Sequence, residues 1–189
     1  MAGKEYIDKS LFDNSWYKPG PIWKRTLWYF TNIIFFLNPM FPFTSVKPFL
    51  LRLYGAKVGK RCLIKPNVNI KYPWFLTIGD YVSIGEGVWI DNLAQVTLED
   101  QVTISQGALL LTGNHNYKAK SFDLMIGEIH ISRGAWICAR SIVGPGIEVG
   151  EYAVVGLGAV ANENCEAFGI YLGNPATRVN TRRFEESEE

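Results

Sequence analysis

The chain has 189 residues and a mass of 21.3 kDa, enough for one domain with an appendage. Hydrophobic residues make up 48% of it, so a core can form and intrinsic disorder is excluded. Nineteen basic and 18 acidic residues give a net charge of +1, which excludes a globally charged binder of nucleic acid. Three cysteines without a CxxC pair indicate a reducing compartment, so we expect a cytoplasmic protein.

Residues 1–57 form a helical appendage in our interpretation. The apolar run TLWYFTNIIFFL at 26–37 is shorter than the roughly 20 residues that a bilayer span requires. No cleavage site of a signal peptide accompanies it. We predict one helix over 22–37, stopped by Asn38-Pro39, and a second helix over 46–54, closed by Gly55.

Two roles are open for this appendage. It can cap the open edge of a repetitive fold or form a subunit interface, or it can anchor the protein peripherally on the inner face of a membrane. The first helix is apolar nearly all round, which favours burial over membrane-surface association. Its aromatic residues are Trp23, Trp28, Tyr29, Phe30, Phe35 and Phe36.

From Val58 onward, an aliphatic residue recurs every six positions, and glycine follows it in six of the fourteen hexads. Neither a helix nor a flat strand has this period. The leading residues are Val58, Ile64, Ile70, Ile78, Ile84, Ile90, Leu98, Ile104, Ile131, Ile137, Val143, Val149, Val155 and Ala161.

A short strand and a turn in each hexad explain this period. Three hexads then form one coil of a three-sided column, and coils stack about 4.8 Å apart with the aliphatic residue inward. We expect the glycine to adopt a corner conformation that a Cβ would disfavour. Two-residue slips at 76–77 and 96–97 each follow three hexads, which places both at one corner. The sequence thus predicts a mainly β solenoid over 58–172, followed by a C-terminal extension and acidic tail at 173–189.

The hexad pattern [LIV]-[GAED]-x-x-[small]-x, followed by LGNPATRV at 172–179, resembles the hexapeptide-repeat acyltransferases. DNLAQVTL (91–98), ISQGALLLTGNHNY (104–117) and GAWICARSIVGPGIEVGEYAVVGLGAV (134–160) are most similar to acetyltransferases of the colanic-acid type. The resemblance covers about residues 55–184. It implies a left-handed parallel β-helix, acetyl-CoA as acyl donor, no metal, a sugar acceptor that is free, lipid-linked or nucleotide-linked, and a homotrimer with sites between subunits.

The hexad period breaks once, between Ile104 and Ile131. From Leu98 to Ile131 there are 33 residues, 15 more than three hexads occupy, so we predict an excursion loop at 112–128. This loop contains His115. An imidazole can deprotonate a sugar hydroxyl near pH 7, and the resemblance assigns the general base to His115. The other histidine, His130, alternates away from the core and is expected at the surface.

The resemblance implies further site residues, each with an ordinary structural alternative as a corner residue or a solvated charge. Gly85 replaces an acceptor-binding Asn of relatives that act on simple sugars, and Glu163 replaces a common Lys, so the acceptor and one phosphate contact are expected to differ. The expected acceptor-binding residues are Asp91, Asn92, Asn114 and Tyr117, and the expected cofactor-binding residues are Trp136, Ala139, Leu157, Asn162, Arg178, Arg182 and Arg183.

The leading hypothesis is an O-acetyltransferase that moves acetyl from acetyl-CoA to a sugar hydroxyl by direct attack. An N-acyltransferase acting on an amino-sugar nucleotide would use the same scaffold. A non-catalytic β-helix scaffold is the alternative from another class. A zinc-dependent hydratase needs three histidine ligands per site, which two histidines in the chain disfavour.

Overall fold

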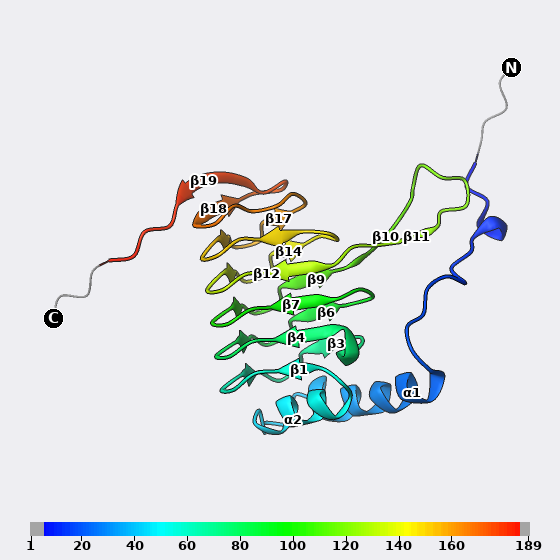
Figure 1. Ribbon diagram of the computed structural model, residues 1–189, viewed down its shortest axis with the longest axis horizontal. Coiled ribbons are helices and arrows are strands. Elements are labelled where there is room, and N and C mark those ends of the chain that lie inside the picture. Colours follow the sequence, from blue (N-terminus) through cyan, green and yellow to red (C-terminus); the bar gives the residue numbers. More distant parts are fainter. Residues whose placement is uncertain (1–5, 186–189) are drawn as a thin grey trace, which may run out of the picture.

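The computed structural model describes residues 6–185, so the end of the predicted acidic tail, from residue 186, lies outside the described range. A column of stacked coils stands on two helices (Figure 1). Short parallel strands from successive coils pair with one another and form three walls. The predicted mainly β solenoid with a helical N-terminal segment is therefore confirmed, while its left hand stays a prediction of the resemblance.

The walls contain one strand from each coil. The first wall has β1 (Lys57–Val58), β4 (Leu76–Ile78), β7 (Val96–Leu98), β12 (Ile129–Ile131) and β15 (Glu148–Val149). The second has β2 (Leu63–Ile64), β5 (Ser83–Ile84), β8 (Thr103–Ile104), β13 (Trp136–Ile137), β16 (Val154–Val155) and β18 (Gly169–Leu172), with β19 (Thr177–Thr181) antiparallel at its end. The third has β3 (Asn69–Ile70), β6 (Trp89–Asp91), β9 (Leu109–Leu111), β14 (Ile142–Val143) and β17 (Val160–Ala161).

The leading residues of the hexads fill the interior of the column. From Ile64 to Ala161, every one of them is at most 2% exposed. In-register pairs such as Ile84 with Ile104 repeat this inward position from coil to coil. Burial of one aliphatic side chain per strand supplies the main hydrophobic stabilisation of the column.

Glycine occupies the second place of six hexads for a different reason from the one predicted. A Cβ built on Gly79 would lie 2.6 Å from the backbone nitrogen of Asp100 in the next coil. Left-handed backbone instead occurs at the fourth place of a hexad, for example at Gly107 (φ +66°) and Gln101 (φ +61°). The expected corner conformation is therefore wrong for the second place, where the close approach of the next coil excludes a side chain.

All additional residues enter at one edge of the column, where the third wall passes into the first. We name residues 71–75, 92–95 and 112–128 the insertion edge. The first coil has the one-turn helix η3 (Pro73–Phe75) there, and the third has a hairpin of β10 (Gly113–His115) and β11 (Leu124–Ile126). The extra residues of the first two coils and the long excursion thus occupy the same edge (Figure 1), whereas residues 76–77 and 96–97, where the slips were predicted, lie in β4 and β7 directly after it.

Two helices close the lower end of the column. After η1 (Lys9–Leu11), the chain forms α1 (Ile22–Thr31), which continues as the π-helix η2 (Asn32–Phe36), and then α2 (Val46–Leu53). Trp28, Phe36 and Leu51 are buried against the first coil.

The helices donate hydrogen bonds to carbonyl groups of the first coil, which has no coil beneath it. The indole Nε1 of Trp28 donates to the carbonyl of Ile70 at 2.8 Å. The Nζ of Lys47 donates to the carbonyl of Lys65 at 2.7 Å. Arg52 donates in the same way to two carbonyls of β1 and its turn. The cap therefore satisfies an open sheet edge that would otherwise be free to pair with another chain.

The first helix, for which the sequence favoured burial in a cap or a subunit interface, is buried within this chain on one face only. Trp23, Tyr29 and Phe30 are 63%, 60% and 56% exposed, because only the opposite face of α1 meets the column. Within residues 6–185, no helix combines the length and the apolar character that crossing a bilayer demands.

Candidate active site

His115 is the last residue of β10, on the hairpin that leaves the insertion edge. Its ring stacks on the ring of Phe122, with 4.5 Å between centroids and 8° between planes. The Nδ1 of His115 lies 3.0 Å from the carbonyl oxygen of Phe122. Because a carbonyl only accepts, Nδ1 carries the hydrogen and Nε2 of the neutral ring has the free lone pair. His115 is thus held in the tautomer that a general base requires.

Residues on both sides of His115 shape its hairpin. The side-chain oxygen of Asn114 accepts a hydrogen bond from the backbone nitrogen of His115 at 2.8 Å, and Tyr117 is 71% exposed. The ring of Phe12, far away in sequence, has its centroid 6.1 Å from that of His115. Sequence reasoning missed Phe12 and Phe122, since neither residue belongs to a repeat or a motif.

Asn114 and Asn162 line one cleft at the insertion edge, with a volume of about 410 Å³. The cleft lies between the base of the hairpin and the edge of the next two coils. The structure therefore brings one predicted acceptor residue together with one predicted cofactor residue. The other lining residues are Met125, Ile126, Gly127, Gly144, Pro145 and Gly146.

Three further predicted cofactor residues lie along a different edge, between the second and third walls. Trp136 is 43% exposed, and its Nε1 donates to the hydroxyl of Ser105 at 2.8 Å. Leu157 is 75% exposed, and the backbone nitrogen after it, of Gly158, bonds the carbonyl of Ala139 at 3.0 Å. The third wall separates these residues from the insertion edge, so one chain does not bring them to His115.

The predicted phosphate-binding arginines have partners within the chain. Arg178 forms an ion pair with Glu166, and Arg182 donates to the carbonyls of Gly134 and Tyr152 at 3.1 and 3.3 Å. These contacts lie near the edge between the first and second walls. Arg178 and Arg182 thus have partners within the chain, whereas Arg183 is exposed, and the predicted contact of all three with the nucleotide phosphates stays a prediction.

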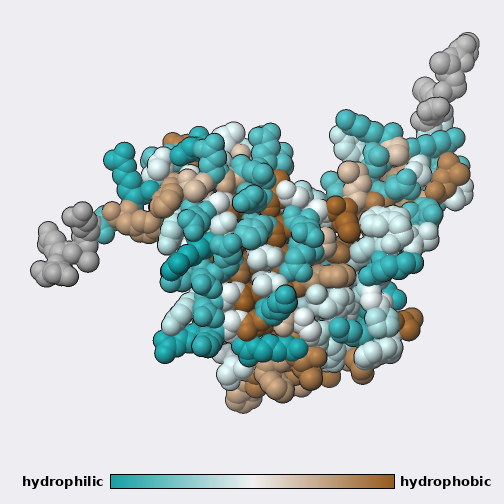
Figure 2. Space-filling view, viewed as in Figure 1, coloured by the Kyte–Doolittle hydropathy of each residue, from teal (hydrophilic) through white to brown (hydrophobic). Residues whose placement is uncertain are grey.

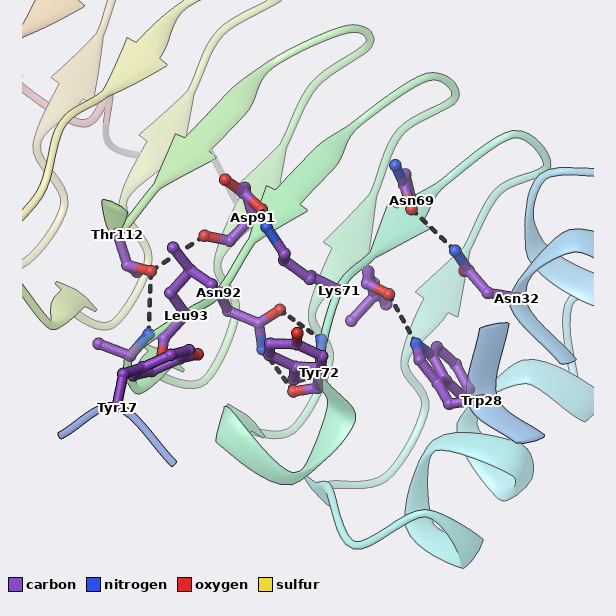
Figure 3. Close-up of polar contacts among 12 residues, drawn as sticks. Tyr17, Trp28, Asn32, Asn69, Lys71, Tyr72, Asp91, Asn92, Leu93 and Thr112 are labelled. Carbon is purple, nitrogen blue, oxygen red and sulfur yellow. Dashed lines mark hydrogen bonds and ion pairs between the residues drawn. The ribbon is translucent and has the colours of Figure 1, made fainter. Parts of the chain in front are cut away.

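A second cleft of about 400 Å³ lies between α1 and the outer face of the third wall (Figure 3). Aromatic rings and polar side chains both line it, which is typical of a pocket for a polar ligand with apolar faces. The aromatic residues are Trp28, Tyr29, Tyr72 and Trp89, and the polar ones are Arg25, Asn32, Asn69, Lys71 and Asp91.

Predicted acceptor residue Asp91 lines this second cleft. Its carboxylate forms an ion pair with the Nζ of Lys71 at 2.8 Å (Figure 3). Asn32 is 7% exposed and donates from Nδ2 to Oδ1 of Asn69 at 2.8 Å, while its own Oδ1 has no hydrogen-bond partner among the described residues. Unpaired buried polar groups cost free energy, so such an atom indicates a ligand or water in the cleft. No sequence motif marked Asn32 or Arg25.

Asn92 has a structural role, in place of the acceptor contact expected for it. Its side chain is fully buried, and Nδ2 donates to the carbonyls of Tyr72 and Phe75 at 2.6 and 3.1 Å. Its Oδ1 accepts from the backbone nitrogen of Tyr72 at 3.0 Å (Figure 3). The amide therefore joins the first two coils and has no free group for a substrate.

Nearby, Tyr17 donates from its hydroxyl to the carbonyl of Leu93 at 2.8 Å. Burial, together with Tyr72 and Asp91, raises the pKa of Tyr17 well above its ordinary value, so the phenol stays protonated.

The chain is similar to known proteins in sequence and in fold. No family model matches the chain. It is 37% identical over 136 residues, which cover 72% of this chain and 75% of the relative, to a putative colanic acid biosynthesis acetyltransferase, WcaF, from Escherichia coli strain K12.

Solved structures share the fold. A galactoside acetyltransferase in complex with coenzyme A superposes with a TM-score of 0.74 and 20% identity, covering 84% of this chain and 80% of the other. AntD, an N-acyltransferase from Bacillus cereus in complex with dTDP and 3-hydroxybutyryl-CoA, has a TM-score of 0.62 and 19% identity, covering 72% and 88%. With the repeat architecture and the identity to WcaF, the chain belongs to the hexapeptide-repeat acetyltransferase family.

Proposed function

We propose that this protein is an acetyl-CoA-dependent O-acetyltransferase that modifies a sugar hydroxyl in bacterial polysaccharide biosynthesis. The observation that carries the proposal is His115, whose Nδ1 is bound to the Phe122 carbonyl while Nε2 is left basic. Family membership supports acetyl transfer, and the relatives supply the donor: one neighbour holds acetyl-CoA and another holds coenzyme A.

In this mechanism, Nε2 of His115 takes the proton of the acceptor hydroxyl while the hydroxyl oxygen attacks the thioester carbonyl. The Nδ1 hydrogen bond to Phe122 stabilises the imidazolium that forms, because a carbonyl oxygen attracts the positive ring. Nε2 then returns the proton to the thiolate of coenzyme A as it departs. His115 ends the cycle neutral and no group is left covalently on the chain.

We assign the acceptor sugar to the cleft beside Asp91. The rings of Trp89 and Tyr72, which both line the cleft, offer surfaces for the apolar face of a sugar, and the Lys71–Asp91 pair offers charged hydrogen-bonding groups for its hydroxyls.

We assign the acyl donor to the edge that carries Trp136, Ala139 and Leu157. Exposed apolar side chains there suit a pantetheine chain, and Gly158 has open space where a Cβ would stand. Because this edge and His115 lie on different sides of one column, the proposal includes a homotrimer in which one subunit's His115 meets the donor edge of its neighbour.

The test compares the two histidines of the chain. We expect His115→Gln to lower kcat for release of coenzyme A by about 10² to 10⁴-fold, because the base is lost. His130→Gln is the matched control, since His130 only pairs with Glu99 at 2.8 Å on the outer face of the first wall and should keep near-wild-type activity.

The same assay, with acetyl-CoA as donor, measures release of coenzyme A with a panel of matched hydroxy and amino sugars as acceptors. Release of coenzyme A only with hydroxy sugars supports O-acetylation. Acylation of amino sugars alone would favour the N-acyltransferase alternative, the activity that AntD is named for. Undiminished turnover of His115→Gln on its acceptor would reject His115 as the base.

A further inference from the structure

The capping helices leave a broad apolar surface at the lower end of the column, on the side away from the hairpin of His115 (Figure 1). Figure 2 shows this underside in brown, with hydrophilic residues directly above it. We name it the lower platform. Its members, each 41–85% exposed, are Ile22, Trp23, Leu27, Tyr29, Phe30, Ile33, Ile34, Met40, Phe43, Phe49 and Leu53.

The platform is the outer face of the same helix that caps the column. Trp23, Leu27 and Phe30 are spaced by four and three residues, which places them on one stripe of α1. Trp28 lies on the other face and is buried at 2% exposure. Packing against the column therefore explains the inner face of α1 but not its apolar outer stripe. Single exposed apolar residues are ordinary, whereas a contiguous patch of this kind marks an interaction surface.

The charge of this region is equally one-sided. Residues 14–79, which form both helices, the first coil and part of the second, contain ten basic residues and no Asp or Glu. The remaining 123 residues therefore hold all 18 acidic residues of the chain and nine of its 19 basic residues. Six of these ten basic side chains are exposed: Lys18, Arg52, Lys57, Lys60, Arg61 and Lys65.

An apolar surface surrounded by basic residues distinguishes between two possible binding partners of the platform, a second copy of the chain and a lipid bilayer. A second copy of the chain, docked end to end, would bring two basic regions together without any acidic group between them, and like charges oppose such contact. A bilayer with anionic headgroups offers apolar acyl chains for the stripe and negative charge for the surrounding lysines and arginines. Trp and Tyr side chains also prefer the boundary between headgroups and acyl chains.

We propose that the lower platform docks the protein on the surface of an anionic phospholipid bilayer. The aromatic stripe of α1 enters the headgroup boundary, and the exposed basic residues of the first coil contact the lipid phosphates. The cleft beside Asp91 shares Tyr29 and Ile33 with the platform, so docking places the mouth of that cleft next to the membrane. This inference does not depend on the chemistry proposed for His115.

Vesicle flotation with the full chain tests the proposal. We expect binding to phosphatidylcholine vesicles that contain about 30% phosphatidylglycerol, weaker binding at high salt, and little binding to pure phosphatidylcholine. Leu27→Gln/Phe30→Gln should reduce binding by on the order of tenfold or more, because apolar contact is lost. Val179→Gln, which changes an apolar residue 54% exposed on β19, is the matched control and should bind like wild type.

A second pair of variants tests the charge. Lys57→Gln/Lys60→Gln should reduce binding to the anionic vesicles by about tenfold. Lys118→Gln/Lys120→Gln changes the net charge equally, but on the hairpin, and should bind like wild type. Thermal unfolding of each variant confirms that it is folded before flotation.

Three results would overturn the proposal. The first is binding by folded Leu27→Gln/Phe30→Gln that equals that of the wild type, and the second is no binding of the wild type to anionic vesicles. The third is a smaller mass of this variant than of wild type by light scattering, which would show that another copy of the chain covers the platform.

Discussion

Lys47 is fully buried beneath the first coil, where its Nζ donates to the carbonyl of Lys65 and lies 5.6 Å from the ring centroid of Phe36. Burial lowers the pKa of Lys47 from 10.5 to about 8, because the charged form loses its hydration. The unfolded chain keeps this proton up to a higher pH than the native protein does. The free energy of unfolding therefore rises with pH between about 8 and 10.5 from this residue.

Lys47→Gln isolates the contribution of this group, since glutamine keeps an N–H donor but does not titrate. We expect the wild type to gain stability relative to the variant by on the order of 1–3 kcal/mol between pH 8 and pH 10. Urea unfolding of both proteins across this range measures the difference. A constant difference at all pH values would contradict the depressed pKa of Lys47.

Single residues differ in how far the sequence could predict them. The inward direction of the leading residues follows from the hexad period, and His115 stood out at the only break in that period. The burial of Lys47 could not be predicted from the sequence, because it depends on where α2 packs against the first coil. The burial of Asn92 was missed for a similar reason: its partners, Tyr72 and Phe75, lie one coil away.

Among the elements, the segment at 6–21, which we name the strap, has the clearest link to the site. It runs from the tip of the hairpin to the start of α1 (Figure 1). The backbone nitrogen of Asp8 donates to the carbonyl of Lys120 at 2.8 Å, and the Nζ of Lys9 lies 5.7 Å from the ring centroid of Phe122. With Phe12 next to His115, the strap holds the hairpin on one side.

Removal of the Phe12 ring should loosen His115 without changing the donor edge. We expect Phe12→Ala to lower kcat by about tenfold, with little change in KM for acetyl-CoA, since orientation of the base contributes to the rate. Trypsin should also cleave faster after Lys118 and Lys120 on the hairpin. Leu11→Ala is the control, because Leu11 is adjacent and 53% exposed. Equal kcat and equal cleavage of the two variants would show that the strap does not position His115.

Element boundaries were predictable where the pattern was local. Both capping helices lie close to their predicted ranges, because Asn38-Pro39 and Gly55 mark their ends. The exposure of the first helix was not predictable, since an apolar surface all round is equally consistent with burial and with an interaction surface. The strap carries no period or motif, so its contact with the hairpin is visible only in the structure.

For the whole molecule, the decisive feature is that the proposed base and the proposed donor edge lie on different edges of one column. His115 leaves the insertion edge, whereas Leu157 lies between the second and third walls. The hexads predict the column but not the positions of neighbouring copies, so the period carries no information on a shared site. A trimer that completes each site with two subunits makes a distinctive kinetic prediction.

Two inactive variants should restore activity when their subunits are mixed. His115→Gln lacks the base, and Leu157→Arg blocks the donor edge with a bulky charge at an exposed position. If each site takes His115 from one subunit and the donor edge from its neighbour, a random equal mixture contains intact sites at about one quarter of the interfaces. We therefore expect about a quarter of wild-type activity after co-refolding or co-expression, measured as release of coenzyme A. A mixture as inactive as its two components, although light scattering shows mixed trimers, would place the whole site within one chain.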